Sequence, residues 1–262
     1  MRFAKRFILI LLSSLLLLAV IPAAAQADDG DERQLPPGAV QLPRTGDYVL
    51  RIDGGYTDAH METVAGQSCL RVDLYLDGVT ADRKLSSISF KLVYDAEQLT
   101  YVQYRRFSGT GLNDAANPNT PGQFNFALTS TNGSQLNSTT PLVSLFFTLN
   151  EGVGSGSQIR FGFSEPIQSS YLKPNYTSQL CSTGAQLKPF GVGTVWGDAN
   201  CDCDVTAADA SLVLRAVVGL TSLTGRGLTN AKVSGQTTLC TEDAVLILRY
   251  AVGLIEQFPA EG

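Results

Sequence analysis

The sequence has few groups that could carry out acid–base or nucleophilic chemistry. His60 is the only histidine among 262 residues, and it lies in a turn-like segment without the neighbouring Ser or Cys that marks a catalytic triad. Cys201 and Cys203 are separated by one residue, whereas a redox-active pair has two residues between its thiols. These absences predict a protein that is not an enzyme.

Basic residues are also scarce, with 19 Lys and Arg against 24 Asp and Glu. Three of the basic residues lie among the first six positions, ahead of an apolar run at residues 7–21 and the small-residue cleavage site Ala25-Gln26-Ala27. The run is short for a membrane span, so we expect residues 1–27 to be a signal peptide rather than an anchor, and the protein to be secreted. Removing them leaves 16 basic and 24 acidic residues, a net charge of −8 that argues against nucleic acid as a partner.

Helical periodicity is missing between residues 47 and 195, where apolar and polar residues alternate instead. The alternating apolar sets are Leu70, Val72, Leu74 and Leu76; Ile88, Phe90, Leu92 and Tyr94; Phe124, Phe126 and Leu128; Val143, Leu145, Phe147 and Leu149; Ile159, Phe161 and Phe163. This pattern predicts a jelly-roll β-sandwich over 47–195 with these sets as its core, and about 150 residues of sandwich leave little room for a catalytic groove. Residues 28–46 are polar and proline-rich, and we expect a flexible leader there.

Oxygen-bearing residues alternate along residues 198–209, at positions 1, 3, 5, 7, 9 and 12 of a twelve-residue window. They are Asp198, Asn200, Asp202, Asp204, Thr206 and Asp209. This is the ligand spacing of an EF-hand calcium loop, in which position 7 offers its backbone carbonyl and position 9 acts through water. Position 6, normally Gly, is Cys203, and position 12 is Asp rather than the bidentate Glu. We predict one Ca²⁺ site here, and the alternative is an acidic surface turn.

A 34-residue repeat follows this loop. Residues 209–220, DASLVLRAVVGL, recur at 243–254 as DAVLILRYAVGL, with eight of twelve positions identical. The helical spacing predicts two apolar faces that pack on each other: Leu212, Val213, Ala216, Val217 and Leu220; Leu246, Ile247, Tyr250, Ala251 and Leu254. Two loop–helix units, each closed by Asp, resemble the dockerin module of cellulosomes. The resemblance implies a small all-α module at 196–262 that docks on a cohesin-bearing scaffold protein.

The dockerin resemblance also implies which residues touch the partner. These are the two residues before each closing Asp and a basic residue on each helix: Ala207, Ala208 and Arg215; Thr241, Glu242 and Arg249. The two sets differ, so docking through one should not be as strong as docking through the other. The alternative is that both arginines are merely solvated.

The second loop has lost the oxygen ligands of the first. Counting back from Asp243 places Lys232, Ser234, Gln236, Thr238 and Cys240 at positions 1, 3, 5, 7 and 9. A hard dication needs more carboxylates than this, so we predict a metal-free second repeat in which Lys232 pairs with Asp243.

Five cysteines in an exported chain predict disulfides. Paired EF-type loops lie side by side, so we expect Cys201 or Cys203 to form a disulfide with Cys240. A zinc ion bound by Cys201 and Cys203 is a weaker alternative. The remaining pair, Cys69 and Cys181, is expected to staple the sandwich and to stabilise it by about 2–4 kcal/mol. Two buried free thiols are the alternative for that pair.

The sandwich segment resembles the cohesin modules that receive dockerins. The resemblance runs over 48–195 and is carried by three segments. Residues 64–74 open like a strand after a Gly-containing turn, residues 88–102 hold a strand ending in Tyr94-Asp95 that leads to a Leu and a further strand, and residues 141–149 form the third segment. It implies a non-catalytic adaptor of a cellulosome-like complex that receives dockerin-bearing enzymes.

Carbohydrate-binding modules share the jelly-roll fold, so polysaccharide binding by the sandwich is the alternative function. A flat polar sheet face, with Ser87, Ser89 and Lys91 as candidates, would favour a dockerin, whereas a planar row of exposed aromatic rings would favour sugar. Trp196, the only tryptophan, is expected to pack at the junction of the two modules rather than to bind sugar.

Overall fold

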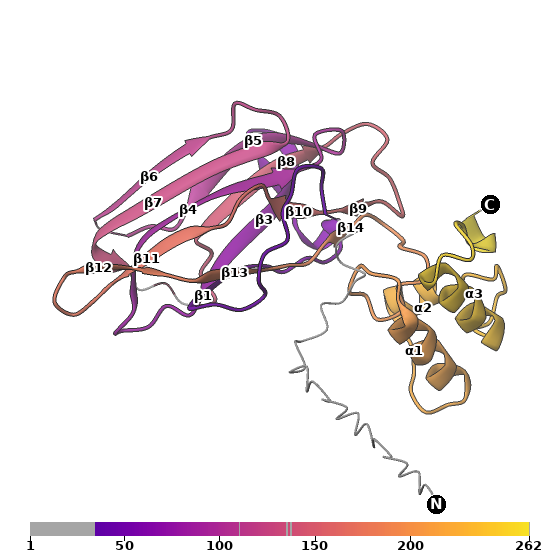
Figure 1. Cartoon of the computed structure of the whole chain (residues 1–262). Coiled ribbons are helices and arrows are strands. Elements are labelled where there is room, and N and C mark those ends of the chain that lie inside the picture. The colour runs from indigo at the N-terminus through magenta and orange to yellow at the C-terminus, as the bar shows by residue number, and fades with distance from the viewer. Residues whose placement is uncertain (1–34, 110, 135, 137, 262) are drawn as a thin grey trace, which may run out of the picture. The chain divides into compact units, whose positions relative to one another are not determined.

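The structure is a computed structural model that describes residues 35–109, 111–134, 136 and 138–261. The expected signal peptide, residues 1–27, lies outside the described residues. From Gln34 onward the chain forms one compact unit, so the domain boundary placed at 195/196 stays a prediction. A β-rich part is followed by three helices (Figure 1). No helix in the described part of the chain is long and apolar enough to cross a membrane.

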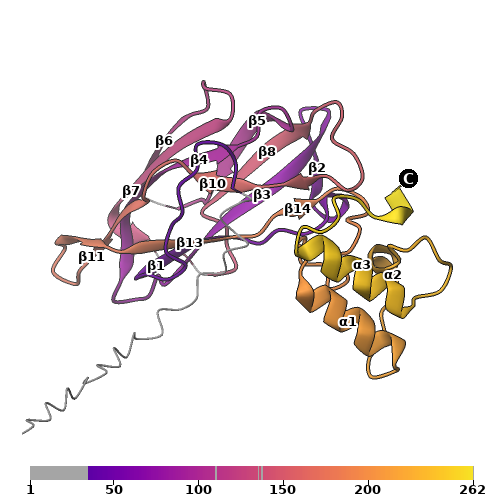
Figure 2. The same cartoon turned by 45° about the vertical axis from the view of Figure 1, so that its right-hand side comes forward.

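The β-rich part contains two six-stranded sheets that face each other, as Figures 1 and 2 show. In spatial order the first sheet contains β13 (Thr183–Leu187), β1 (Tyr48–Ile52), β3 (Gln67–Asp77), β8 (Val143–Leu149) and β5 (Leu99–Arg106), with β2 (Met61–Val64) paired to β3. Its neighbours are antiparallel except for the parallel pair β1 and β13.

The second sheet is antiparallel throughout. Its order is β12 (Ser178–Cys181), β11 (Gln168–Leu172), β4 (Lys84–Tyr94), β7 (Gln123–Ser134) and β6 (Leu112–Asn117), with β10 (Phe161–Phe163) paired to β4. A short pair, β9 (Gln158–Ile159) and β14 (Phe190–Gly191), leads toward the helices. The mainly β sandwich expected from the alternation is confirmed.

The apolar sets that alternate in the sequence form the sandwich core. All of their members are buried except Leu149, which is half-buried. Each fully buried large side chain stabilises the fold by about 1.5–3 kcal/mol, which explains why period-two patterning fixes which side of each strand faces inward. The ring of Phe147 lies within 6.0 Å, centroid to centroid, of the rings of Tyr94, Tyr101 and Phe161, so aromatic packing joins the two sheets.

The described part of the expected leader, residues 35–46, lies along the sandwich and is not a free segment. The backbone N–H of Val40 donates to the carbonyl of Phe163 at 2.7 Å, and the N–H of Ala185 donates to the carbonyl of Pro43 at 2.8 Å. A Cβ at Gly184 would lie 2.5 Å from that Pro43 carbonyl, so glycine is required for the close approach. Our expectation of a flexible leader is therefore wrong for these residues.

The helices are α1 (Ala207–Val217), α2 (Gly225–Ala231) and α3 (Thr241–Ala251), and two short 3₁₀ turns, η2 (Thr57–Ala59) and η3 (Pro259–Glu261), complete the fold. α1 and α3 cover the same eleven positions of the repeat, whereas α2 was not expected. Ala210 and Val213 of α1 pack with Ala244 and Ile247 of α3 in a helical core. Trp196 is partly buried against this core, as expected for packing at the junction.

Four of the ten residues predicted for the packed faces are instead exposed. Tyr250 and Ala251 lie at the end of α3, and Leu220 and Leu254 are the most exposed, at 72% and 69%. The helices end three residues earlier, and the chain turns at Gly219 and Gly253, both with positive φ, so the helical spacing no longer applies. The apolar faces that we predicted extended one turn too far.

Candidate calcium loop and docking surfaces

The first loop, residues 198–206, is held by side chains that accept hydrogen bonds from its own backbone. The Oδ1 atom of Asp198 accepts from the N–H of Asp202 at 3.1 Å, and Oδ2 accepts from the N–H of Cys203 at 2.9 Å. Asn200 Oδ1 accepts from the same Asp202 N–H, and Asp202 Oδ1 accepts from the N–H of Asp204 at 3.0 Å. The side chains at positions 1, 3 and 5 therefore turn inward, as the alternation requires.

The closing residue, Asp209, connects the loop to α1. Its Oδ1 accepts from the N–H of Asn200 at 3.1 Å, and its Oδ2 accepts from the N–H of Thr206 at 2.9 Å. Thr206 in turn accepts from the N–H of Ala208, so the start of α1 has a capping box. Asp209 thus caps the start of α1 as well as closing the loop.

Two carboxylates of this loop are removed from solvent. Asp198 and Asp209 both have no exposed surface. Burial raises the pKa of Asp198 to about 6, and the charges of Asp209 and Asp202 act in the same direction, while hydrogen bonds from Tyr56 and Cys203 oppose it. Burial likewise raises the pKa of Asp209. Buried carboxylates that destabilise one another's charged form gain from a bound cation.

The donor chemistry of the loop fits calcium, because its side chains offer carboxylate, amide and hydroxyl oxygens. Arg160 pairs with the Asp204 carboxylate at 2.8 Å, which leaves the predicted ligand of that residue, its backbone carbonyl, unaffected. Across the described ranges no three His, Cys, Asp or Glu side chains are grouped as a metal site. An ion here would therefore depend on Asn200, the Asp204 carbonyl and Thr206 to complete its shell.

Position 6 of the loop has the backbone conformation that glycine usually provides. Cys203 has φ +68°, as its place in the window implied, and Cys201 has φ +63°, which was not foreseen. Such a conformation costs a non-glycine residue roughly 1–2 kcal/mol. Cys203 is buried, and its thiol donates to the carbonyl of Gly55 at 3.5 Å.

All five cysteines are free, so the expected disulfides are absent from the structure. Cys69 is on β3 in a small buried cluster with Val64 and Phe146, whereas Cys181 is on β12 of the other sheet and contacts Ser169. Cys201 and Cys203 likewise form no bond with Cys240, whose thiol contacts Asp243. The buried-thiol alternative describes Cys69 correctly.

The second loop, residues 232–240, is closed by backbone groups and not by Lys232. Asp243 accepts from the N–H groups of Ser234 and Cys240, each at 2.8 Å. The structure shows no ion pair between Lys232 and Asp243, both of which it describes, so this expectation is wrong. The backbone already satisfies the carboxylate that the lysine was expected to neutralise.

The six residues that the dockerin resemblance assigns to partner contact are all exposed. Further exposed apolar residues stand on the same side of each helix. We define the α1 face as Ala207, Ala208, Leu214, Arg215 and Val218, and the α3 face as Thr241, Glu242, Leu248, Arg249 and Val252. The added residues could have been found from the sequence, because Leu214 and Val218 recur after 34 residues as Leu248 and Val252. All four lie on the side of their helix that faces away from the helical core.

The outer face of the second sheet is polar and has small side chains. Ser87, Ser89 and Lys91 of β4 pair with Thr129, Ala127 and Asn125 of β7. Beyond β7, the strand β6 continues this face with Asn113, Ala115 and Asn117. Among the described residues, the strongly exposed aromatic side chains are Tyr176 and Tyr250, which come from different parts of the fold and form no row.

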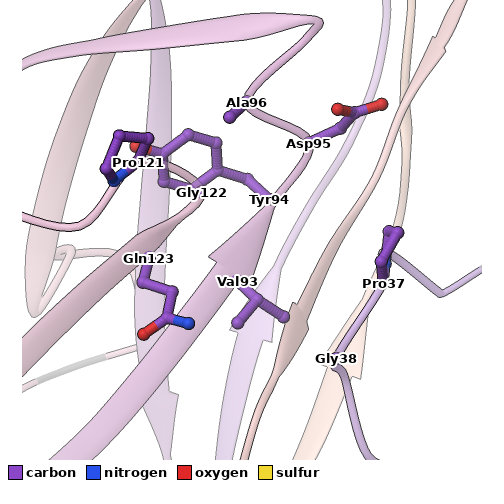
Figure 3. A pocket seen from close by; sticks show the side chains of 9 residues that line it. All are labelled: Pro37, Gly38, Val93, Tyr94, Asp95, Ala96, Pro121, Gly122 and Gln123. Atoms are coloured by element: carbon purple, nitrogen blue, oxygen red, sulfur yellow. The ribbon is translucent and has the colours of Figure 1, made fainter.

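The remaining candidates carry no clear chemistry. Figure 3 shows a pocket beside the end of β4 that is lined by nine residues, of which Asp95 alone is charged, and none of the predicted site residues lines it. His60 packs edge-on against Phe190, with ring centroids 5.0 Å apart, and burial lowers the pKa of its imidazole. It therefore serves packing in the sandwich.

Three residues that contact the first loop from outside were not predicted from the sequence. They are Tyr56, Arg160 and Asn230, and Arg226 in turn contacts the ring of Tyr56. Tyr56 and Asp198 are 142 residues apart, and no spacing rule connects such positions. Only the packing of the helices beside the sandwich brings them together.

The sequence matches no protein-family model and no curated protein. Among solved structures, it is similar to the sixth cohesin of Acetivibrio cellulolyticus scaffoldin B, solved with a Cel5 dockerin mutant, at 19% identity and a TM-score of 0.42 over 55% of this chain and 98% of that chain. It is also similar to a cohesin module of a family 33 glycoside hydrolase from Clostridium perfringens, at 15% identity and a TM-score of 0.39 over 59% and 98%.

A third similar structure is a non-cellulosomal cohesin from the archaeon Archaeoglobus fulgidus, at 12% identity and a TM-score of 0.40 over 56% of this chain and 91% of that chain. Similarity at these identities and TM-scores carries no conclusion about what this chain binds.

Proposed function

We propose that this protein is a secreted, non-catalytic adaptor of a polysaccharide-degrading complex. Its helical module, residues 196–261, docks on a cohesin-bearing scaffold protein when calcium orders the first loop. Its sandwich receives the dockerin of another protein, such as an enzyme, on the polar face of the second sheet. The proposal combines the dockerin resemblance of the repeat with the surfaces described above.

The observation that carries the proposal is the matching pair of exposed helical faces. α1 and α3 begin and end at equivalent positions of the repeat, and each presents a leucine, an arginine and a valine to solvent at the same places. Solvent-exposed apolar patches on a small module mark interaction sites. Arginine is enriched among the residues that dominate binding at protein interfaces, so an arginine beside each apolar pair favours a protein partner.

The absence of an aromatic row in the described residues favours a protein partner for the sandwich over a polysaccharide. Stacking of sugar rings requires aromatic faces that are open to solvent. Ser87, Ser89 and Lys91 instead belong to a flat surface of hydroxyl, amide and short side chains, where hydrogen bonds dominate. We therefore favour the adaptor over a glycan-binding module attached through its helices.

The test is a pull-down with the immobilised full chain from proteins secreted by the organism that produces it, in calcium and then in chelator. We expect cohesin-bearing and dockerin-bearing proteins to be recovered only with calcium. The double variant Leu214→Glu/Leu248→Glu should lose the former alone, and Ser89→Arg should lose the latter alone. Val40→Glu, which changes an apolar residue of similar exposure outside both surfaces, is the matched control.

Two results would contradict this function. Recovery of neither class of protein, together with retention of the chain on insoluble polysaccharide, would make the sandwich a glycan-binding module. Recovery that is unchanged by chelator would remove the role of calcium in docking.

A further inference from the structure

Tyr56 joins the sandwich to the first loop through its phenol group. It lies between β1 and η2, and its side chain is 8% exposed. The hydroxyl donates to Oδ2 of Asp198 at 2.9 Å and accepts a hydrogen bond from the side-chain amide of Asn230 in α2. The same amide donates to the backbone carbonyl of Asp198 at 2.9 Å. Asp198 is therefore held, side chain and backbone, by residues from outside the loop.

The sandwich touches the first loop at two more positions. The Cys203 thiol donates to the carbonyl of Gly55, the residue before Tyr56, at 3.5 Å. Arg160, between β9 and β10, pairs with Asp204 at 2.8 Å. Positions 1, 6 and 7 of the window are thus all in contact with the sandwich. The hydrogen bonds that the structure shows for the second loop, in contrast, connect it to α2, Asp243, Ala260 and its own residues, all of them in the helical part.

Arg226 of α2 fixes the ring of Tyr56. Its guanidinium lies 4.1 Å from the ring centroid, donates to the carbonyl of Gly193 at 2.9 Å, and pairs with Asp58 of η2. A cation over the ring and an ion pair beside it leave the phenol one orientation, with the hydroxyl toward Asp198. The described residues therefore form a connected polar network from the sandwich to the first loop.

We propose that Tyr56 is a positioning residue for the calcium loop, so that calcium binding and the packing of the helices on the sandwich stabilise each other. Its hydroxyl and the Cys203 N–H occupy Oδ2 of Asp198, which turns Oδ1 toward the loop. Hydrogen-bonded neighbours that orient a ligand commonly change metal affinity by about 10- to 100-fold. Because the coupling is reciprocal, the bound ion stabilises the contact with the sandwich by the same factor.

The inference rests on the proposed calcium site, and calorimetric titration of the full chain with calcium chloride tests it. Tyr56→Phe removes only the hydroxyl, and we expect it to weaken calcium binding by about tenfold. Tyr104→Phe is the matched control, because Tyr104 donates to Asp114 at the same 2.9 Å on a part of the sandwich remote from the loop. The control should bind calcium as the wild type does.

Limited proteolysis of the segment 188–197 gives a second readout of the same coupling. Calcium should slow cleavage of this junction in the wild type by about tenfold, the same factor by which we expect Tyr56→Phe to weaken calcium binding. In the Tyr56→Phe variant, calcium should slow cleavage by a smaller factor. If Tyr56→Phe does not fold, Arg226→Gln takes its place, since it frees the Tyr56 ring but keeps the hydroxyl, and a several-fold weaker affinity is expected.

The outcomes separate the two proposals. Equal calcium affinity in the wild type and in these variants would overturn the positioning role and leave the calcium site intact. A wild type that takes up no calcium would remove the proposed site and this inference with it.

Discussion

At the residue scale, Asp198 concentrates the chemistry of the first loop. It is fully buried, it accepts hydrogen bonds from Tyr56, Asp202 and Cys203, and its pKa is raised to about 6, chiefly by burial. A carboxylate with a pKa of about 6 takes up a proton as the pH falls toward 6, unless a cation occupies its place. Calcium and protons should therefore compete for this one group.

This competition predicts a pH-dependent calcium affinity. The folded-state pKa of Asp198 lies above its ordinary value of 3.8, so the folded chain without calcium binds a proton between about pH 4 and 6 that the unfolded chain does not. In chelator, this group consequently contributes more to stability as the pH falls through about 6. With calcium the sign reverses, and the dissociation constant should rise about tenfold per pH unit below 6.

The measurement is a set of calcium titrations between pH 5 and pH 8 on the wild type and on Asp198→Asn. The variant cannot lose a proton at this position, so it should bind calcium weakly at every pH. A wild-type affinity that stays constant from pH 5 to pH 7 would contradict the role of Asp198 as a ligand.

At the scale of elements, the two loop–helix units share a framework but differ in the ligands of their loops. Asp209 and Asp243 occupy equivalent positions, both are fully buried, and both accept from the backbone N–H that begins their helix. The capping role is therefore common to both repeats. The proposed cation ligands belong to the first repeat alone, because the second loop has Lys232, Ser234 and Gln236 in the places of Asp198, Asn200 and Asp202.

This difference predicts that alanine at the two positions will have the same effect on stability and different effects on calcium. Asp209→Ala and Asp243→Ala should each lower the free energy of unfolding in chelator by about 1–2 kcal/mol, because each loses a helix cap. Only Asp209→Ala should abolish calcium uptake. Chemical denaturation and calorimetric titration measure the two effects, and a stoichiometry of two tightly bound ions per chain would contradict the prediction.

The strands and helices that could be predicted from the sequence are those whose formation depends on the spacing of nearby residues. Period-two alternation located the core strands, and the repeat located α1 and α3, because burial and helix formation depend on near neighbours in the chain. The short helix α2 was missed, since residues 225–231 hold two glycines and no apolar stripe. The docking of residues 35–46 was missed because it depends on backbone hydrogen bonds to Phe163 and Ala185, which leave no pattern of side chains.

The candidate site divides in the same way. The proposed ligands of the first loop come from one continuous segment, so their spacing could be read from the sequence. Tyr56 and Arg160 reach the loop only through tertiary structure, as Arg226 reaches Tyr56, and the residue types alone indicate nothing. The cysteine pairings failed for a related reason, because the number of thiols does not say which strands or loops lie within the reach of a disulfide.

At the scale of the whole molecule, two hydrophobic cores are connected by polar contacts. The core of the sandwich and the core of the helices share no buried residue. Between them lie the hydrogen bond from Tyr56 to Asp198 and the ion pairs Arg226–Asp58 and Arg160–Asp204. Polar contacts of this kind contribute little to stability compared with a core, so each part should unfold in its own transition.

Scanning calorimetry of the full chain should therefore show two transitions in chelator. Calcium at about 100 times its dissociation constant should stabilise the helical part by about 2.7 kcal/mol, a shift on the order of 10 °C for a unit of this size. It should stabilise the sandwich by no more than the coupling through Tyr56, about 1.4 kcal/mol for a tenfold effect. Leu74→Ala, in the sandwich core, should lower the sandwich transition alone, because it costs about 2–5 kcal/mol there. Calcium that stabilised the sandwich transition as strongly as the helical one would place the ion in the sandwich, and the first loop would then be only an acidic turn.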